Sequence, residues 1–179
     1  MTLRLIPALA VILLLAGCGK DDQKTSGPIT LTNDLFGTSL YYSMGLSFND
    51  AGAISSLTVP GPDVFVEAGS LAEGNPVEPF LSANTLEPSF AFMGEYVTAS
   101  EAIDAFEALT DASTLSSVLS FIDLGVPLRN NQIWVVRTRD LKYAKIRIIE
   151  VVLNMTPNPD FASCRLEWVW QPDGSALFP

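Results

Sequence analysis

Residues 132–151, QIWVVRTRDLKYAKIRIIEV, alternate apolar and basic side chains on both sides of a short polar break. A period of two is typical of a β-strand that buries one face, and the break at Asp140-Leu141-Lys142 fits a three-residue hairpin loop. A two-residue loop would mix the two faces by setting apolar residues of one arm opposite basic residues of the other. The segment therefore predicts an antiparallel, half-buried hairpin.

The second face of this hairpin carries the basic residues. A loop centred on Leu141 places Arg137 opposite Lys145, with Arg147 on the same face. We expect this face to contact solvent, as the outward faces of antiparallel sheets usually do. Two like charges directly opposite each other are destabilising unless an anion lies nearby. Arg137, Lys145 and Arg147 are therefore also candidate ligand-binding residues of an anion site.

The closing segment CRLEWVWQ, residues 164–171, alternates in the same way. If it adds to the sheet beside the hairpin, Glu167 lies on the basic face and can balance its charge. Trp168 and Trp170 then point into the core. Apolar residues move from even to odd positions after Ile148, and this change of phase predicts a β-bulge near Ile148-Ile149.

The rest of the chain reads as short strands with a helical insertion. Strand-like segments at 40–48, 64–68 and 88–97 are separated by turn residues. Thr98 and Glu101 have the spacing of a capping box, and the apolar periodicity that follows predicts helices at about 99–109 and 113–124. The predicted fold class is mainly β: an antiparallel sheet or sandwich-like single domain with one or two short helices inserted at about 99–124.

The amino-terminal residues MTLRLIPALAVILLLAGCGKDD have the order of a lipoprotein signal peptide. A basic residue precedes an apolar run at 5–15, which is too short for a membrane-spanning helix, and the run ends in Leu15-Ala16-Gly17-Cys18. We expect 1–17 to be the signal peptide, 18–28 to be the lipidated Cys18 with a flexible linker, and 29–179 to be the β domain. The Lys-Asp-Asp after the cysteine resembles a surface-export signal of Bacteroidetes lipoproteins.

Composition excludes several classes of function. The formal net charge of −10 predicts repulsion from nucleic acid. The chain has no His, which removes the commonest general base and the commonest metal ligand. No nucleophile–base pair, metal-ligand cluster or glycine-rich phosphate loop is visible, so we expect no catalytic and no metal-ligating residues, and no enzyme.

Two segments carry a resemblance to a known family. QIWVVRTRDLKYAKIRIIEV at 132–151 and LEWVWQPDGSALF at 166–178 resemble the C-terminal hairpin and closing strand of HmuY-like lipoproteins. The resemblance implies an all-β fold with little helix. It also implies attachment to the outer membrane through acylated Cys18, exposure at the cell surface, and capture of haem for an outer-membrane receptor.

Two classes of function follow. The first is a surface lipoprotein that binds haem or another small hydrophobic ligand. Haem-binding members of the family often use His as an axial ligand, and here only Met44, Met93 and Met155 of the mature chain could replace it, of which we take Met93 as the candidate. The second is an accessory lipoprotein that binds a protein partner and no haem, which the missing His favours. No cofactor is certain, and haem is the candidate.

Overall fold

The computed structural model describes residues 25–37, 40, 42–85, 87–113, 120–156 and 161–179. It is mainly β, as predicted, with a single antiparallel sheet and a short helix. The strands are β1 (Ser26–Phe36), β2 (Tyr42–Ser47), β3 (Gly52–Ser55), β4 (Val64–Gly69), β5 (Glu78–Ala83), β6 (Phe90–Glu95), β7 (Gln132–Arg137), β8 (Tyr143–Asn154) and β9 (Phe161–Trp170), and the helix is α1 (Ala99–Ala108). The sheet begins three residues before the expected domain boundary at residue 29.

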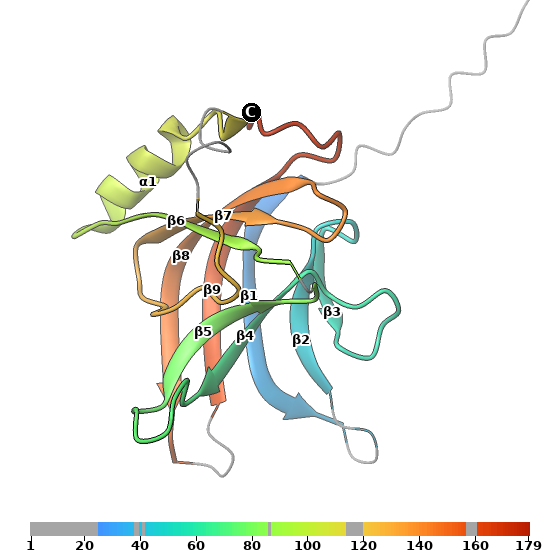
Figure 1. Ribbon diagram of the computed structural model, residues 1–179, viewed down its shortest axis with the longest axis vertical. Helices are drawn as coiled ribbons and strands as arrows, with labels where there is room; N and C mark the ends of the chain where they lie inside the picture. Colours follow the sequence, from blue (N-terminus) through green and yellow to red (C-terminus); the bar gives the residue numbers. More distant parts are fainter. Residues whose placement is uncertain (1–24, 38–39, 41, 86, 114–119, 157–160) are drawn as a thin grey trace, which may run out of the picture.

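The strands follow the order β5-β4-β2-β1-β9-β8-β7-β6, with β3 beside β2, and the sheet curls strongly (Figure 1). One segment bridges the two edge strands. Ile122 exchanges backbone hydrogen bonds with Phe90 of β6, and Gly125 exchanges them with Leu81 of β5. A Cβ atom at Gly125 would lie 3.1 Å from the Cβ of Leu81, so glycine allows this close approach. The segment thus joins the edges of the curled sheet.

The main core fills the inside of the curled sheet. It is formed by Leu31, Leu46, Phe48, Val64, Val66, Leu81, Phe90, Trp134, Val136, Ile146, Ile148, Cys164, Leu166, Trp168 and Trp170, together with smaller neighbours. Phe48 meets Trp168 edge-on at 5.8 Å between ring centroids and stacks on Trp170 at 6.2 Å. The prediction that both tryptophans point into the core is confirmed.

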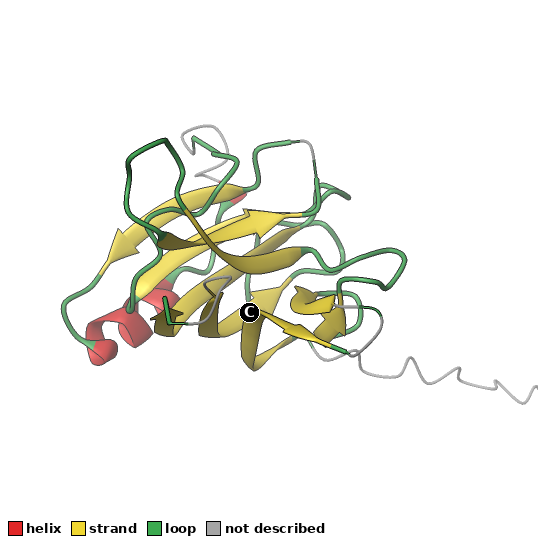
Figure 2. Cartoon of the chain, turned by 90° about the horizontal axis from the view of Figure 1, so that it is seen from below, coloured by secondary structure: helices red, strands yellow, loops and turns green. Residues whose placement is uncertain are grey.

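A smaller apolar cluster lies on the outer face of the sheet, where α1 packs outside the curl (Figure 2). It is formed by Ala91, Ala112, Val135, Ala176 and Phe178. The predicted capping box of α1 is confirmed: the Glu101 amide donates to Thr98 Oγ1 at 3.2 Å, and the Thr98 amide donates to Glu101 Oε2 at 3.1 Å. Of the second expected helix, residues 114–119 lie outside the described residues. Residues 120–124 are not helical, because Ile122 pairs with β6.

The β7–β8 hairpin has a three-residue loop, but the loop lies one residue earlier than predicted. Thr138 N donates to Lys142 O at 2.9 Å, so the loop is 139–141 and Arg137 opposes Tyr143. The predicted register was therefore wrong, and Arg137 does not face Lys145. The error shifts the pairing by two residues along β8, which leaves every side chain on its predicted face. Between β8 and β9 the register shifts between Ile148 and Glu150, and this confirms the predicted bulge.

Leu141 in this loop has a positive φ of 58°, and its side chain is 62% exposed. The left-handed conformation costs an L-residue about 1–2 kcal/mol, whereas glycine adopts it freely but loses about 0.5–1 kcal/mol through its more flexible unfolded state. We expect Leu141→Gly to raise the free energy of unfolding by about 0.5–1 kcal/mol. Leu141→Ala is the matched control, because it removes the side chain and keeps the strain. Equal denaturation midpoints of the two variants would contradict the prediction.

Cys164 is fully buried in β9, and burial raises the pKa of its thiol to about 12. The thiolate is the reactive species. The folded protein therefore lowers the reactivity of Cys164 in two ways: the raised pKa keeps the thiol protonated, and burial keeps reagents away from it. We expect a Cys18→Ser form of the protein to give no thiol release with Ellman's reagent at mildly alkaline pH. One equivalent should react after unfolding in guanidinium. Rapid labelling of the folded protein would place Cys164 at the surface.

Candidate ligand-binding cleft

Lys145 and Arg147 project from β8 on the outer face of the sheet, as predicted, but they are not solvated there. Lys145 is 2% exposed and Arg147 is 8% exposed. The expectation of a solvent-exposed basic face was therefore wrong for these two residues. The physical reason is that α1 packs on β8, where its carboxyl-terminal end covers Lys145, while Arg147 lies against Glu167 of β9.

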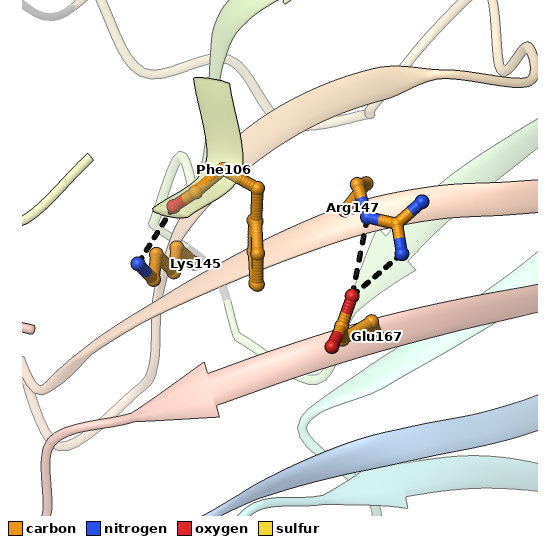
Figure 3. Close-up of polar contacts among 4 residues, drawn as sticks. All are labelled: Phe106, Lys145, Arg147 and Glu167. Atoms are coloured by element: carbon orange, nitrogen blue, oxygen red, sulfur yellow. Dashed lines mark hydrogen bonds and ion pairs between the residues drawn. The ribbon is translucent and has the colours of Figure 1, made fainter. Parts of the chain in front are cut away.

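Lys145 holds the end of α1. Its Nζ donates to Phe106 O at 2.7 Å and to Leu109 O at 2.9 Å (Figure 3). The same ammonium lies 4.7 Å from the centroid of the Phe106 ring and 5.5 Å from that of Phe178. The last turn of α1 has no basic residue of its own, so Lys145 supplies the positive charge that favours a helix C-terminus. Burial lowers the pKa of Lys145, and the carboxylates of Glu107 and Glu167 oppose that shift.

Arg147 pairs with Glu167 of β9 across the sheet. Both Nε, at 3.1 Å, and Nη2, at 2.7 Å, donate to the same carboxylate oxygen, Oε2 (Figure 3). The prediction that Glu167 lies on the basic face is confirmed. The pair is only partly used. Among the described residues nothing hydrogen-bonds to Nη1 of Arg147 or to Oε1 of Glu167. Figure 3 shows the guanidinium nitrogen without a dashed line pointing away from the carboxylate of Glu167.

Arg137 lies apart from this pair. Its Nη2 donates to Pro88 O at 2.8 Å, and its guanidinium lies 4.6 Å from the centroid of the Phe121 ring. These contacts attach β7 to the segment before β6 and to the segment that bridges the edge strands. Arg137 therefore has a structural role in the described part of the chain and is not brought together with Lys145 and Arg147.

Met93 lies in β6, where the β6–β7 register shifts between Phe92 and Gly94. Its side chain is half-buried and packs against the smaller apolar cluster of the outer face. It does not line the cleft described below. The structure thus separates Met93 from Lys145 and Arg147, although the sequence analysis placed all of them in one candidate ligand site.

A cleft of about 400 Å³ opens between α1 and the strands β8 and β9. Its charged lining consists of Glu107, Lys145, Arg147 and Glu167, and its apolar lining includes Ile103, Phe106 and Val169. Ser26 and Gly27, at the start of β1, form part of its rim. The volume falls near the lower end of the range of about 300–1,000 Å³ that small-molecule sites occupy.

The sequence analysis did not predict most of the lining residues, and Ile103 and Glu107 of α1 are two examples. Ile103 belongs to the apolar periodicity that predicts the helix at about 99–109, but it is 39% exposed, and Glu107 is one of many scattered carboxylates. Helical periodicity identifies the face of α1 that packs on the sheet. It does not show which residues of that face are fully covered by the sheet and which line a cleft beside it. No sequence signal could have selected these two residues.

Within the described ranges, no three His, Cys, Asp or Glu side chains lie close enough together to hold a metal ion. In the same part of the chain, no helix has the length and apolar character needed to cross a membrane. Comparison with known proteins finds no matching family, no similar characterised protein and no similar solved structure.

Proposed function

We propose that this chain is a surface lipoprotein of the outer membrane, anchored through Cys18, which acts by binding a small hydrophobic ligand and not by catalysis. The observation that carries the proposal is the cleft under α1, which combines apolar walls with the Arg147–Glu167 ion pair, in which Arg147 is buried and Glu167 is partly exposed. Sites with mostly apolar walls and a few convergent polar groups are typical of small-molecule binding.

The cleft would stand close to the membrane in this arrangement. Ser26 forms part of its rim and lies eight residues after Cys18. An extended chain spans at most about 3.3–3.6 Å per residue, so the rim could be no more than about 30 Å from the acylated cysteine. A ligand leaving the cleft would thus be released near a receptor in the same membrane.

The anchor is tested by Cys18→Ala. An acyl chain contributes about 0.8 kcal/mol per buried methylene, and stable attachment requires more than one chain, as a lipidated amino-terminal cysteine provides. We expect the variant to remain unprocessed and to lose palmitate labelling in cells, while the wild type is cut before Cys18. Labelling of the variant would remove the anchor from the proposal.

Haem is the first ligand to test, because the hairpin and closing strand resemble HmuY-like lipoproteins. Haemin is titrated into a soluble Cys18→Ser form, with Met93→Ala as a parallel variant. A Soret shift that saturates at one equivalent, and that Met93→Ala abolishes, supports haem with Met93 as its axial ligand. A shift that persists in Met93→Ala leaves haem and removes Met93. No shift at micromolar haemin removes haem and leaves other small hydrophobic ligands.

A second candidate is an accessory lipoprotein that binds a protein partner. It is favoured by exposed apolar residues at the β1–β2 end of the sheet. Phe36 pairs with Tyr42 at 5.8 Å between ring centroids, and Phe36 is 42% exposed. Leu57 follows Ser56, which is hydrogen-bonded to Ser43, and is 47% exposed. Loss of a partner on replacement of Phe36 and Leu57 with serine, without loss of stability, would support this candidate.

A further inference from the structure

We propose that the cleft under α1 selects a zwitterion with an apolar side group, of which a hydrophobic α-amino acid is the simplest example. The inference rests on the proposed function, since it names the ligand class of the same cleft. Three observations support it: Arg147 Nη1 and Glu167 Oε1 have no hydrogen-bond partner among the described residues, the charges in the cleft balance, and an apolar wall lies beside them.

Among the described residues, one donor group and one acceptor of the ion pair have no hydrogen-bond partner. Arg147 uses Nε and Nη2, and Glu167 uses Oε2 for both contacts. The free Nη1 of Arg147 can donate to a ligand carboxylate, and the free Oε1 of Glu167 can accept from a ligand ammonium. Hydrogen bonds to ionised groups are stronger than those between neutral groups, so both contacts would favour a charged ligand. An α-amino acid carries both groups on one carbon, so it can bridge the two ends of a single pair.

The charge of the cleft favours a ligand that is neutral overall. Lys145 and Arg147 bring two positive charges, and Glu107 and Glu167 bring two negative charges. The chain as a whole has a formal charge of −10, so a simple anion is repelled on approach. Lys145 Nζ already donates hydrogen bonds to two carbonyl oxygens at the end of α1, so Arg147 is the main group that can bind a ligand anion. A zwitterion meets no net repulsion and can use both signs of charge.

The apolar wall lies beside these charges. Ile103 is 39% exposed, Phe106 covers Lys145 from α1, and Val169 faces the cleft from β9. An aliphatic side chain placed against Ile103 would remove apolar surface of both partners from water. The small volume of the cleft, about 400 Å³, limits the ligand to a compact molecule.

The test uses three compounds that share one hydrocarbon body, titrated by calorimetry into the Cys18→Ser protein with its whole mature chain. They are L-leucine, 4-methylpentanoate, which lacks the ammonium, and 3-methylbutylamine, which lacks the carboxylate. We expect leucine to bind and each analogue to bind at least about tenfold more weakly, because each loses one charge-assisted hydrogen bond.

Variants locate the site. Glu167→Gln should weaken leucine at least about tenfold, because it removes the negatively charged acceptor of the ammonium. It should not weaken 4-methylpentanoate, because it also removes the carboxylate that neutralises Arg147, the proposed donor to the ligand carboxylate. Where Glu167→Gln fails to fold, Glu107→Gln and Ile103→Ser serve instead, since both positions are exposed. Each should weaken leucine severalfold. Glu150→Gln is the control, because it removes an exposed carboxylate from β8 away from the cleft and should leave binding unchanged.

The outcomes separate this inference from the proposed function. Equal binding of leucine and either analogue would overturn the zwitterion and leave a hydrophobic-ligand cleft. Binding of haemin without binding of leucine would do the same. If neither haemin nor any of the three compounds binds, the inference fails, and the proposed function loses haem and keeps only other small hydrophobic ligands. Leucine binding that every cleft variant leaves unchanged would place the site elsewhere and overturn the inference.

Discussion

Replacing Trp168 with alanine will destabilise the protein by about 3–5 kcal/mol, the range for truncating a buried aromatic side chain. Trp168 is 1% exposed, lies in the central strand β9 and meets the ring of Phe48 edge-on. Its loss leaves a cavity enclosed by strands that are paired on both sides, so the surroundings can relax only in part. The free energy of unfolding from guanidinium denaturation provides the measurement.

Phe92→Ala is the matched control for Trp168, because Phe92 is 49% exposed and its ring contacts the core at the ring of Trp134. We expect a loss below about 1.5 kcal/mol there, the upper value of a single aromatic pair. A loss of less than about 1 kcal/mol for Trp168→Ala would contradict its place in the core.

Lys145→Met will destabilise the protein by about 2–3 kcal/mol and will loosen the end of α1 before the sheet unfolds. Methionine keeps much of the buried stem but leaves the carbonyls of Phe106 and Leu109 without their donor. A hydrogen bond to a charged group contributes about 1.5–3 kcal/mol, and removing the cost of burying an ammonium offsets part of the loss. Denaturation measures the total, and hydrogen exchange of the α1 amides measures the local effect.

Lys142→Met is the matched control for Lys145, because Lys142 lies in the hairpin and is half-buried, and its ammonium lies 5.2 Å from the ring centroid of Trp170 with no hydrogen bond to a buried carbonyl among the described residues. We expect a change below about 1 kcal/mol for it, as for an exposed cation–π contact. A change below about 0.5 kcal/mol for Lys145→Met would agree with the solvated face that the sequence predicted, and it would contradict the burial of the ammonium under α1.

These two predictions differ in how much of them the sequence contained. The alternation through residues 164–171 already placed Trp168 on the core face, because the faces of a strand follow from neighbouring residues alone. The alternation around Lys145 also identified its face correctly. The alternation could not show that this face is covered, because Lys145 donates to the carbonyl of Phe106, which lies 39 positions away in the sequence.

The missed strands show the same limit. β1 has the sequence SGPITLTNDLF, in which Gly, Pro, Asn and Asp obscure the apolar alternation. Its first residues were assigned to the linker after Cys18. The strand forms because β9 offers a full row of partners on one side, from Ser26 opposite Val169 to Thr32 opposite Ser163. Pairing with a neighbour outweighed the weak local preference.

The sequence by itself determined the features that depend on nearby residues. These are the mainly β fold, the faces of β7, β8 and β9, the bulge after Ile148, and the capping box that starts α1. Only the tertiary structure decided the register of the hairpin, the bridge between the sheet edges at Gly125, and the cleft that brings Glu107 to Arg147. The physical reason is that alternation and capping act within a few residues. The burial of a charged face depends on which distant segment packs on it, and no local pattern records that choice.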